Sequence, residues 1–218
     1  MRIYLELKSQ GLEIPFDHQP LMVGTIYKWL GRSILHDRVS LYSFSRLEGG
    51  KMLNNNLIFN NSCSFFISAY EDSIIKKLVA GILKDTDMFY GLKVSNIYLM
   101  EDPNLTKREL FFPASPIFIK RRVEDKIEHF LFDHPLAGEY LKQTLLTKMK
   151  NAGINDETLE LNFFNKNRKG QRKLVRYNGI NNIASLCPVV IHGKPETKLF
   201  AWNVGLGNST GIGFGAIE

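Results

Sequence analysis

The chain has 218 residues, of which 44% are hydrophobic and 23% charged, a composition that excludes intrinsic disorder and collagen-like or coiled-coil chains. No apolar run reaches the roughly 18 residues of a membrane span, so we expect a cytoplasmic protein without a membrane partner. The 28 Lys and Arg residues exceed the 22 Asp and Glu residues, which permits an anionic partner.

Apolar periodicity in the first half predicts the element order β-α-β-β-α-β. The first helix is expected to begin at a cap formed by Asp17 and to continue to about Ile34. The second helix is expected over 71–85. The predicted strands cover residues 2–8, a hairpin arm over 40–47 and 57–60, and residues 64–69 and 93–100.

The polar segment 101–107 is the best candidate for a domain boundary, and we expect domains over 1–104 and 105–218. The second half repeats the order of elements. Its predicted elements are a strand over 115–122, a helix over 133–152, a strand over 158–164, an apolar run over 183–191, a short helix from Pro195 and a closing segment over 213–217. The predicted fold is therefore α+β, with two tandem ferredoxin-like (RRM-like) domains.

A glycine-rich string near the carboxyl end is the most specific motif. Its glycines are Gly205, Gly207, Gly211, Gly213 and Gly215. Glycine permits positive φ and close backbone approach, and successive amides of such a loop can bind phosphate. A dinucleotide-binding fingerprint is not favoured, because that motif opens a helix after an early strand. A helix cap with a tight turn would account for about two of the five glycines.

The Gly-x-Gly, five residues, Gly-x-Gly spacing over 205–215 resembles the signature of the CRISPR-associated endoribonucleases that cut precursor CRISPR RNA within its repeats. Residues 17–19, 24–27, 35–36 and 42–45 are similar to the opening helix and first hairpin of that family. The resemblance implies cleavage without metal or cofactor, in which the 2′-hydroxyl attacks the adjacent phosphate and leaves a 2′,3′-cyclic phosphate and a 5′-hydroxyl. It implies CRISPR repeat RNA as the partner and leaves open an effector complex and a homodimer.

Catalysis would need a base that activates a ribose hydroxyl, and a histidine with a pKa of about 6.5 suits this task. Of the five histidines, His36 stands where the resemblance places the catalytic one. The alternative role of His36 is an interaction with the end of a helix. Tyr27 matches the tyrosine of the first helix of that family, and packing at the edge of the core is its alternative role.

A cation is expected near the phosphate, because charge develops on the phosphate oxygens. Some members of the family carry a lysine a few residues after the histidine. Here no lysine occurs between His36 and Lys51. Arg38, Lys28 and Lys51 are therefore competing candidates.

Two segments are predicted to contact RNA. The first is a basic run without an acidic residue, in which Gly170 is expected to form a hairpin tip and which could also be a solvated loop. The second is the glycine string, which lacks Lys and Arg between Asn208 and Ile212. The RNA-binding candidates are Lys28, Lys166, Arg168, Lys169, Arg172, Lys173, Gly205, Gly207, Asn208, Ser209, Gly213 and Gly215. Stacking of bases on Phe163, Phe164, Tyr177 or Phe214 is less expected than a core position for these rings.

The first hypothesis is thus a metal-independent endoribonuclease that matures CRISPR RNA. The alternative is a non-catalytic subunit that binds the guide RNA in an effector complex, which the missing lysine favours. A general RNA-recognition protein is less favoured, because no aromatic-rich signature of such domains occurs.

Overall fold

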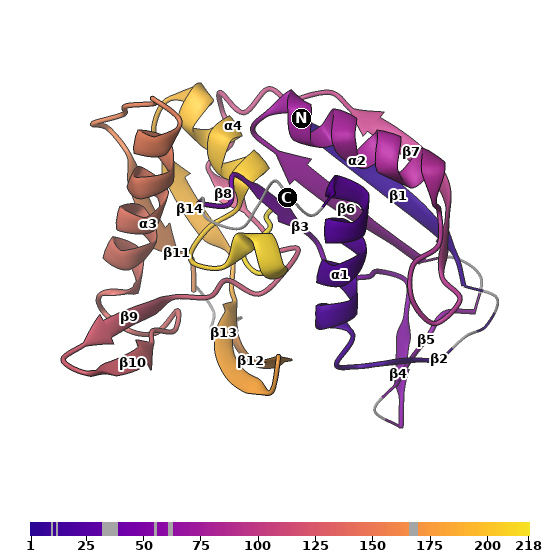
Figure 1. Cartoon of the computed structure of the whole chain (residues 1–218). Coiled ribbons are helices and arrows are strands. Elements are labelled where there is room, and N and C mark those ends of the chain that lie inside the picture. The colour runs from indigo at the N-terminus through magenta and orange to yellow at the C-terminus, as the bar shows by residue number, and fades with distance from the viewer. Residues whose placement is uncertain (10, 12, 32–38, 55, 61–62, 166–169) are drawn as a thin grey trace.

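The computed structural model describes the chain except residues 10, 12, 32–38, 55, 61–62 and 166–169. Figure 1 shows two lobes side by side, each built from a sheet and helices, with the segment after the last α-helix between them. The observed architecture is α+β, as predicted.

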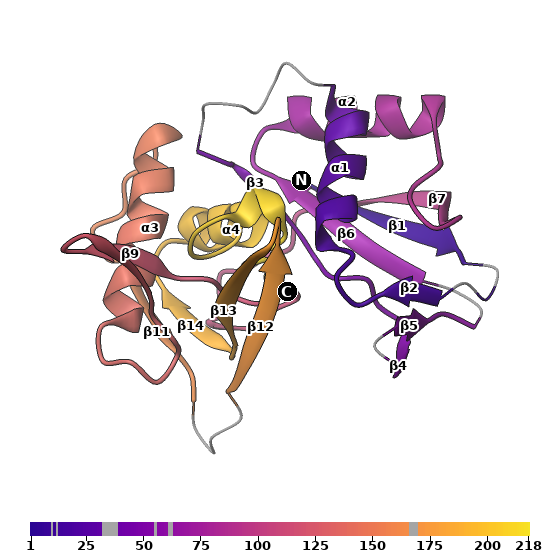
Figure 2. The same ribbon diagram turned by 60° about the horizontal axis from the view of Figure 1, so that its bottom comes forward.

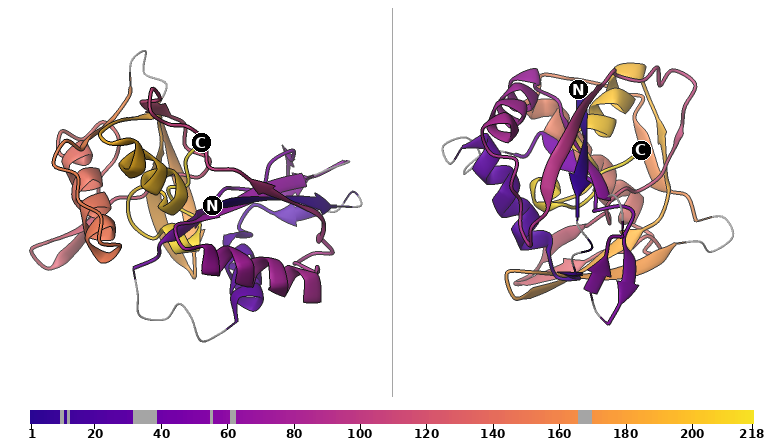
Figure 3. Two further views of the ribbon diagram at one scale, coloured as in Figure 1. Left: turned by 90° about the horizontal axis from the view of Figure 1, so that it is seen from above. Right: turned by 90° about the vertical axis from the view of Figure 1, so that its right-hand side faces the viewer.

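The amino-terminal lobe is a ferredoxin-like unit. Its antiparallel sheet has the order β3-β6-β1-β7, and both helices cover one face of this sheet (Figure 3, left). The elements are β1 (Arg2–Lys8), α1 (Gln19–Leu30), β3 (Tyr42–Phe44), β6 (Cys63–Ala69), α2 (Asp72–Lys84) and β7 (Lys93–Met100).

The first helix is shorter than predicted. His18 rather than Asp17 occupies the N-cap position, and Gly31 ends the helix with a φ of 80°. A residue with this φ ends a right-handed helix, so the prediction that the helix continues past Leu30 without a break is wrong, while residues 32–34 lie outside the described residues.

A small sheet of order β2-β5-β4 is attached to this lobe. It contains β2 (Glu13–Pro15), β4 (Lys51–Leu53) and β5 (Asn56–Ile58). The predicted hairpin between 40–47 and 57–60 is wrong, because β3 pairs with β6 while β5 pairs with β4 and β2.

The carboxyl-terminal lobe repeats the ferredoxin-like order. Its sheet has the order β11-β14-β8 and continues onto the end of the chain, where the Phe112 and Glu218 amides each donate to the other residue's carbonyl (2.8 and 2.9 Å). The elements are β8 (Leu110–Phe111), α3 (Ala137–Asn151), β11 (Glu160–Phe163), β14 (Val189–His192) and α4 (Pro195–Val204). The helix predicted from Pro195 is confirmed.

Two hairpins are inserted into this lobe, and they correct three predictions. They are β9 (Lys120–Val123) with β10 (Lys126–His129), and β12 (Gln171–Tyr177) with β13 (Ile180–Leu186). The predicted strand over 115–122 is wrong, because β8 takes its place in the sheet. The run 183–191 is divided between β13 and β14. Gly170 is not a hairpin tip: the turn lies at Asn178 and Gly179, which both have positive φ.

Each lobe has its own main hydrophobic cluster, formed by buried residues between positions 3 and 94 and between 105 and 217. Arg2 joins the two lobes. Its guanidinium lies between the rings of Phe66 and Trp202 and donates to the carbonyls of Trp202 (3.0 Å) and Ile217 (2.7 Å). Both cysteines are buried and free. Among the described residues, no helix has the length and apolar character needed to span a membrane.

Candidate nucleic-acid interface

The glycine-rich string forms a buried loop over residues 205–215, here called the glycine loop, which includes the 3₁₀-helix η2 (Thr210–Ile212). Gly205 has a φ of 71° and ends α4. A Cβ atom at Gly207 would overlap the carbonyl of Phe118, and one at Gly215 would overlap the carbonyl of Leu206. Close backbone packing therefore requires glycine at more positions of the string than a helix cap and a tight turn would.

Most of the described amides of the glycine loop serve the protein itself. The amides of Leu206, Asn208, Gly213 and Gly215 donate to protein carbonyls at 2.7 to 3.2 Å. Asn208 and Ser209 are the half-exposed residues at one side of the loop. Contacts of the loop with RNA would thus rest on these two side chains more than on backbone amides.

Three tyrosines from three elements meet beside the glycine loop. Tyr42 on β3 is buried and donates to the carbonyl of Gly211 (2.9 Å). Burial raises the pKa of its phenol, and the nearby Tyr27 of α1 raises it further. Tyr27 and Tyr177 of β12 both pack against the amino-terminal core. Figure 2 shows the end of β12 next to the glycine loop and α1.

The candidate cations are not gathered at Tyr27. Lys28 forms an ion pair with Asp85 (2.8 Å), the residue that follows α2. Lys51 is exposed on β4, which lies beyond the amino-terminal end of α1 (Figures 1 and 2), whereas Tyr27 is in its last turns. His36 and Arg38 lie outside the described residues.

The four described histidines all have structural contacts. His18 is half-buried: its Nδ1 lies 2.9 Å from the carbonyl of Pro15, and burial lowers its pKa. His134 Nδ1 accepts from the amide of Leu136 (3.1 Å), and His192 Nδ1 lies 3.1 Å from Glu109. His129 packs edge-on against Phe118.

The basic hairpin, β12 with β13, borders a cleft of about 290 Å³ between the lobes. Lys173 and Arg176 line this cleft together with Arg46 of the amino-terminal lobe, while Asp17, Glu48 and Glu218 contribute opposite charge. Arg172 forms an ion pair with Asp133 (2.7 Å). Lys166, Arg168 and Lys169 lie outside the described residues.

The aromatic side chains considered for base stacking lie mainly in the cores. Phe214 is fully buried, and Phe163 packs against the carboxyl-terminal core. Tyr177 is partly buried at the edge of the amino-terminal core. Phe214 thus cannot stack on a base.

Two cationic residues near the glycine loop were not singled out from the sequence as site residues. Arg121 contacts Asn208 (Nη1 to Oδ1, 3.3 Å), and Lys148 donates to Thr210 Oγ1 (3.0 Å). Lys148 stands three residues after Leu145 and one before Met149, on the buried stripe of α3. A lysine on an apolar helix stripe was the signal available in the sequence.

Comparisons with known proteins point to one family. The model for the C-terminal part of the CRISPR-associated protein Cas6 matches residues 100–218. A curated relative from Pyrococcus furiosus, described as a putative CRISPR-associated endoribonuclease-like protein Cas6, is 26% identical over 173 residues, which cover 74% of this chain and 69% of the relative.

Solved structures share the tandem ferredoxin-like fold. A CRISPR-associated protein Cas6 superposes with a TM-score of 0.85 at 22% identity, over 100% of this chain and 98% of that one. A RAMP protein described as binding different RNA substrates gives a TM-score of 0.86 at 21% identity, with coverage of 100% and 98%. The product of a Cas6-related gene from Pyrococcus furiosus gives 0.84 at 21% identity, with coverage of 100% and 97%.

Proposed function

Since the chain belongs to the Cas6 family of CRISPR-associated proteins, we propose that it cuts CRISPR repeat RNA and so matures guide RNA. In the proposed reaction, a base takes the proton of the 2′-hydroxyl as this oxygen bonds to the adjacent phosphorus. The bond between phosphorus and the 5′-oxygen breaks, and that oxygen leaves as a hydroxyl after it receives a proton. The products are a 2′,3′-cyclic phosphate and a 5′-hydroxyl, and neither metal nor cofactor takes part.

The observation that carries this proposal is the meeting of α1, the glycine loop and the basic hairpin at the junction of the lobes. Gln19 donates to the carbonyl of Ile212 (2.5 Å), and Tyr42 holds the carbonyl of Gly211. The loop is thereby attached to the helix that carries Tyr27. An RNA strand bound along the loop would pass close to this phenol.

In this proposal His36 is the general base and Tyr27 orients the attacking hydroxyl or contacts the phosphate. The structural contacts of the other four histidines support His36 as the remaining candidate. Arg38 is the preferred cation, because Lys28 is paired with Asp85. Lys51 lies on β4, beyond the amino-terminal end of α1, whereas Tyr27 is near its carboxyl-terminal end.

The basic hairpin is proposed to follow the phosphates of the RNA. Arg172, Lys173 and Arg176 lie on β12, directly after the basic segment 166–169. Contacts of Lys and Arg with phosphates release counterions and make affinity depend on salt. This hairpin would supply affinity and register rather than chemistry.

A non-catalytic subunit that binds guide RNA is the second candidate. The observation in its favour is that neither Lys28 nor Lys51 is brought to Tyr27, although a fixed cation is often a large part of phosphoryl-transfer catalysis. The two functions differ in what happens to the RNA. A binding subunit leaves the RNA intact, whereas the enzyme yields a cyclic phosphate.

The test is incubation of the purified protein with the CRISPR repeat RNA of its own genome in the presence of a chelator. A matched RNA carries one 2′-deoxy substitution at the mapped cut. Cleavage of only the all-ribose RNA, with a cyclic-phosphate end, supports the enzyme. Tight binding without cleavage supports the guide-RNA-binding subunit, and the absence of both rejects the two proposals.

A further inference from the structure

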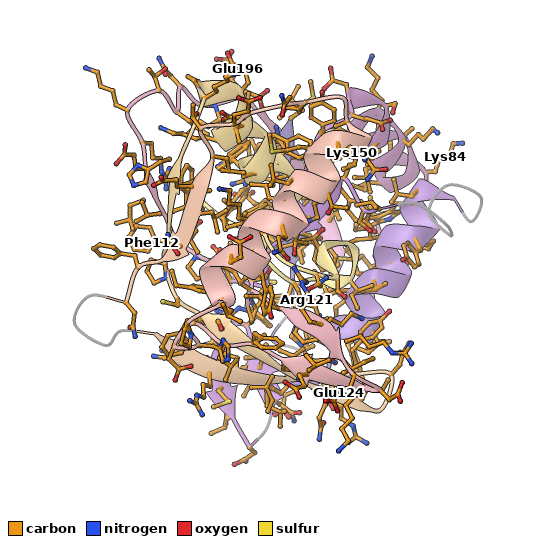
Figure 4. The ribbon with its side chains drawn as sticks, turned by 90° about the vertical axis from the view of Figure 1, so that its left-hand side faces the viewer. Lys84, Phe112, Arg121, Glu124, Lys150 and Glu196 are labelled. Atoms are coloured by element: carbon orange, nitrogen blue, oxygen red, sulfur yellow. The ribbon has the colours of Figure 1, made fainter. Side chains whose placement is uncertain are left out.

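A polar cavity of about 430 Å³ lies where the carboxyl-terminal lobe meets the glycine loop. Its walls come from α3, from β9, from the loop at Asn208 and Ser209, and from Ser40 of the amino-terminal lobe. Figure 4 shows Arg121 beside α3, on the side of the helix where the glycine loop lies. Of the described residues that line the cavity, none is acidic or aromatic.

Lys148 supplies a positive charge to the wall of this cavity. It is 4% exposed, and its ammonium donates to the carbonyls of Val204 and Gly205 (both 3.2 Å) and to Thr210 Oγ1 (3.0 Å). These partners are neutral oxygens, and no carboxylate of the described residues forms an ion pair with it. Burial lowers the pKa of Lys148 to about 7. An ammonium buried without a counter-charge is costly, and an anion in the cavity would offset that cost.

Arg121 supplies a second positive charge in a fixed orientation. One nitrogen donates to the carbonyl of Tyr140 (2.7 Å) and to Thr144 Oγ1 (3.0 Å), and the guanidinium lies 4.9 Å from the centre of the Tyr140 ring. The Asn208 Oδ1 atom accepts from Lys120 and Arg121, so its amide group keeps its donors for a ligand. The other terminal nitrogen donates to the carbonyl of Lys120 (3.0 Å) and to Asn208 Oδ1 (3.3 Å), so Arg121 would act on a phosphate mainly through its fixed positive charge.

We propose that this cavity is a binding subsite for one backbone phosphate of the RNA, with Arg121 and Lys148 as its cations and Asn208 and Ser209 at its edge. The inference rests on the proposed binding of repeat RNA and adds a subsite to it. A phosphate fits the lining because it is negatively charged and only accepts hydrogen bonds. A base is not expected here, because the described lining offers no ring for stacking. The contact therefore adds affinity and register without reading sequence.

The first test compares Arg121→Gln with Arg122→Gln. Both variants remove one charge from β9, but the side chain of Arg122 is 75% exposed and contributes nothing to the cavity. We expect Arg121→Gln to weaken binding of the repeat RNA at least about 10-fold and to lower the salt slope by roughly 0.7 to 0.9, as for one lost phosphate contact. Arg122→Gln should bind as the unmodified protein does. Equal effects of the two variants would overturn the subsite.

The second test identifies the phosphate. RNAs that carry a neutral methylphosphonate at one linkage at a time are bound to the unmodified protein and to Arg121→Gln. One linkage should weaken binding to the unmodified protein about 10-fold and have little effect on the variant. If no linkage shows this coupling, and inorganic phosphate at constant ionic strength raises the melting temperature of the unmodified protein alone, the cavity takes free phosphate and the proposal is wrong.

A second pair of variants keeps the test valid if Arg121→Gln does not fold. Ser209 has a left-handed backbone with a φ of 61°, which Asn and Asp tolerate well. Ser209→Asp should bind RNA at least about 10-fold more weakly than Ser209→Asn, because only the former places a negative charge beside the phosphate. Equal binding of the two would count against the subsite. If the unmodified protein bound no repeat RNA at all, the proposed function itself would fail.

Discussion

At the scale of single residues, His36 carries the sharpest prediction of the proposed chemistry. We expect His36→Ala to lower the single-turnover rate of RNA cleavage by roughly 10² or more with little change in affinity, because a positioned base acts on the rate and not on binding. His134→Ala is the control, since His134 is exposed and its ring accepts from the amide of Leu136 and packs edge-on against Phe130. Equal losses in rate and affinity would indicate a structural role for His36.

Lys148 predicts a specific dependence of stability on pH. Its pKa is about 7 in the folded protein and near 10.5 when exposed. Between these values the unfolded chain binds one more proton, so the free energy of unfolding rises with pH, by at most ~1.4 kcal/mol per pH unit. Below pH 7 both states carry the charge, and the cost of burying it is fully present.

Urea unfolding between pH 6.5 and 9.5 measures this contribution. Lys148→Met should remove the rise, whereas Lys150→Met should keep it, because Lys150 is exposed two residues further along α3 (Figure 4). The slope is compared rather than the absolute stability, since Lys148→Met also loses hydrogen bonds to α4. A rise that persists in Lys148→Met would assign the pH dependence to other groups.

At the scale of secondary-structure elements, Asp156 fixes the start of α4, the helix that leads into the glycine loop. One oxygen accepts from the Lys194 amide (2.8 Å) and Thr197 Oγ1 (2.6 Å), and the other from the amide and hydroxyl of Thr158. Burial acts to raise the pKa of Asp156, but these hydrogen bonds outweigh it and lower the pKa. The resulting stability is present above the ordinary aspartate pKa and is lost as pH falls below about 4.

We therefore expect Asp156→Ala to lower the free energy of unfolding by about 2 kcal/mol at pH 7, since it removes the cap of α4 and leaves buried donors without an acceptor. Glu157→Ala is the control, because Glu157 is the exposed neighbour. Chemical denaturation at pH 7 and pH 3 measures both. At pH 3, below the ordinary aspartate pKa, the unfolded chain binds a proton at Asp156 that the folded chain still excludes. The difference between the two variants should therefore shrink at pH 3, and an unchanged difference would contradict the charged role of Asp156.

The element order was predictable because helices and long strands leave a local apolar period, as in α2 and β1. The first strand of the second lobe was not, because β8 has two residues and is defined by pairing with Val189 and Val190, far along the chain. The strand was instead predicted over 115–122, because this segment contains the apolar run 117–119. The turn at Asn178 and Gly179 was present in the sequence as an Asn-Gly pair, a strong hairpin signal that the basic run obscured.

The candidate site was predictable only in part, for the same physical reason. Local backbone rules account for Gly205 at the end of α4, whereas Gly207 is required by the carbonyl of Phe118 and Gly211 by Ser40 and Tyr42. Such steric demands come from residues distant in sequence and leave no local pattern. The cationic cavity behind the loop likewise depends on tertiary contacts of Arg121 with Asn208 and of Lys148 with Thr210.

At the scale of the whole molecule, the basic hairpin and the glycine loop lie on the junction of two ferredoxin-like lobes, and α2 lies at the other end of the molecule (Figure 1). The last prediction compares the basic segment 166–169, which precedes β12 in the sequence and lies outside the described residues, with α2. Neutralising Lys166, Arg168 and Lys169 together should weaken RNA binding and lower its salt slope by roughly 2 to 3, since each lost phosphate contact removes about 0.7 to 0.9.

The matched control replaces the three exposed lysines of α2, Lys76, Lys77 and Lys84, by Gln. Both triple variants change the net charge equally, so a long-range effect of charge would alter them alike, although salt screens such an effect within about 10 Å at 0.1 M. Fluorescence anisotropy with the repeat RNA from 50 to 300 mM salt separates the two cases. If the slopes fall equally, RNA affinity depends on net charge, and the segment 166–169 makes no specific contact with the RNA backbone.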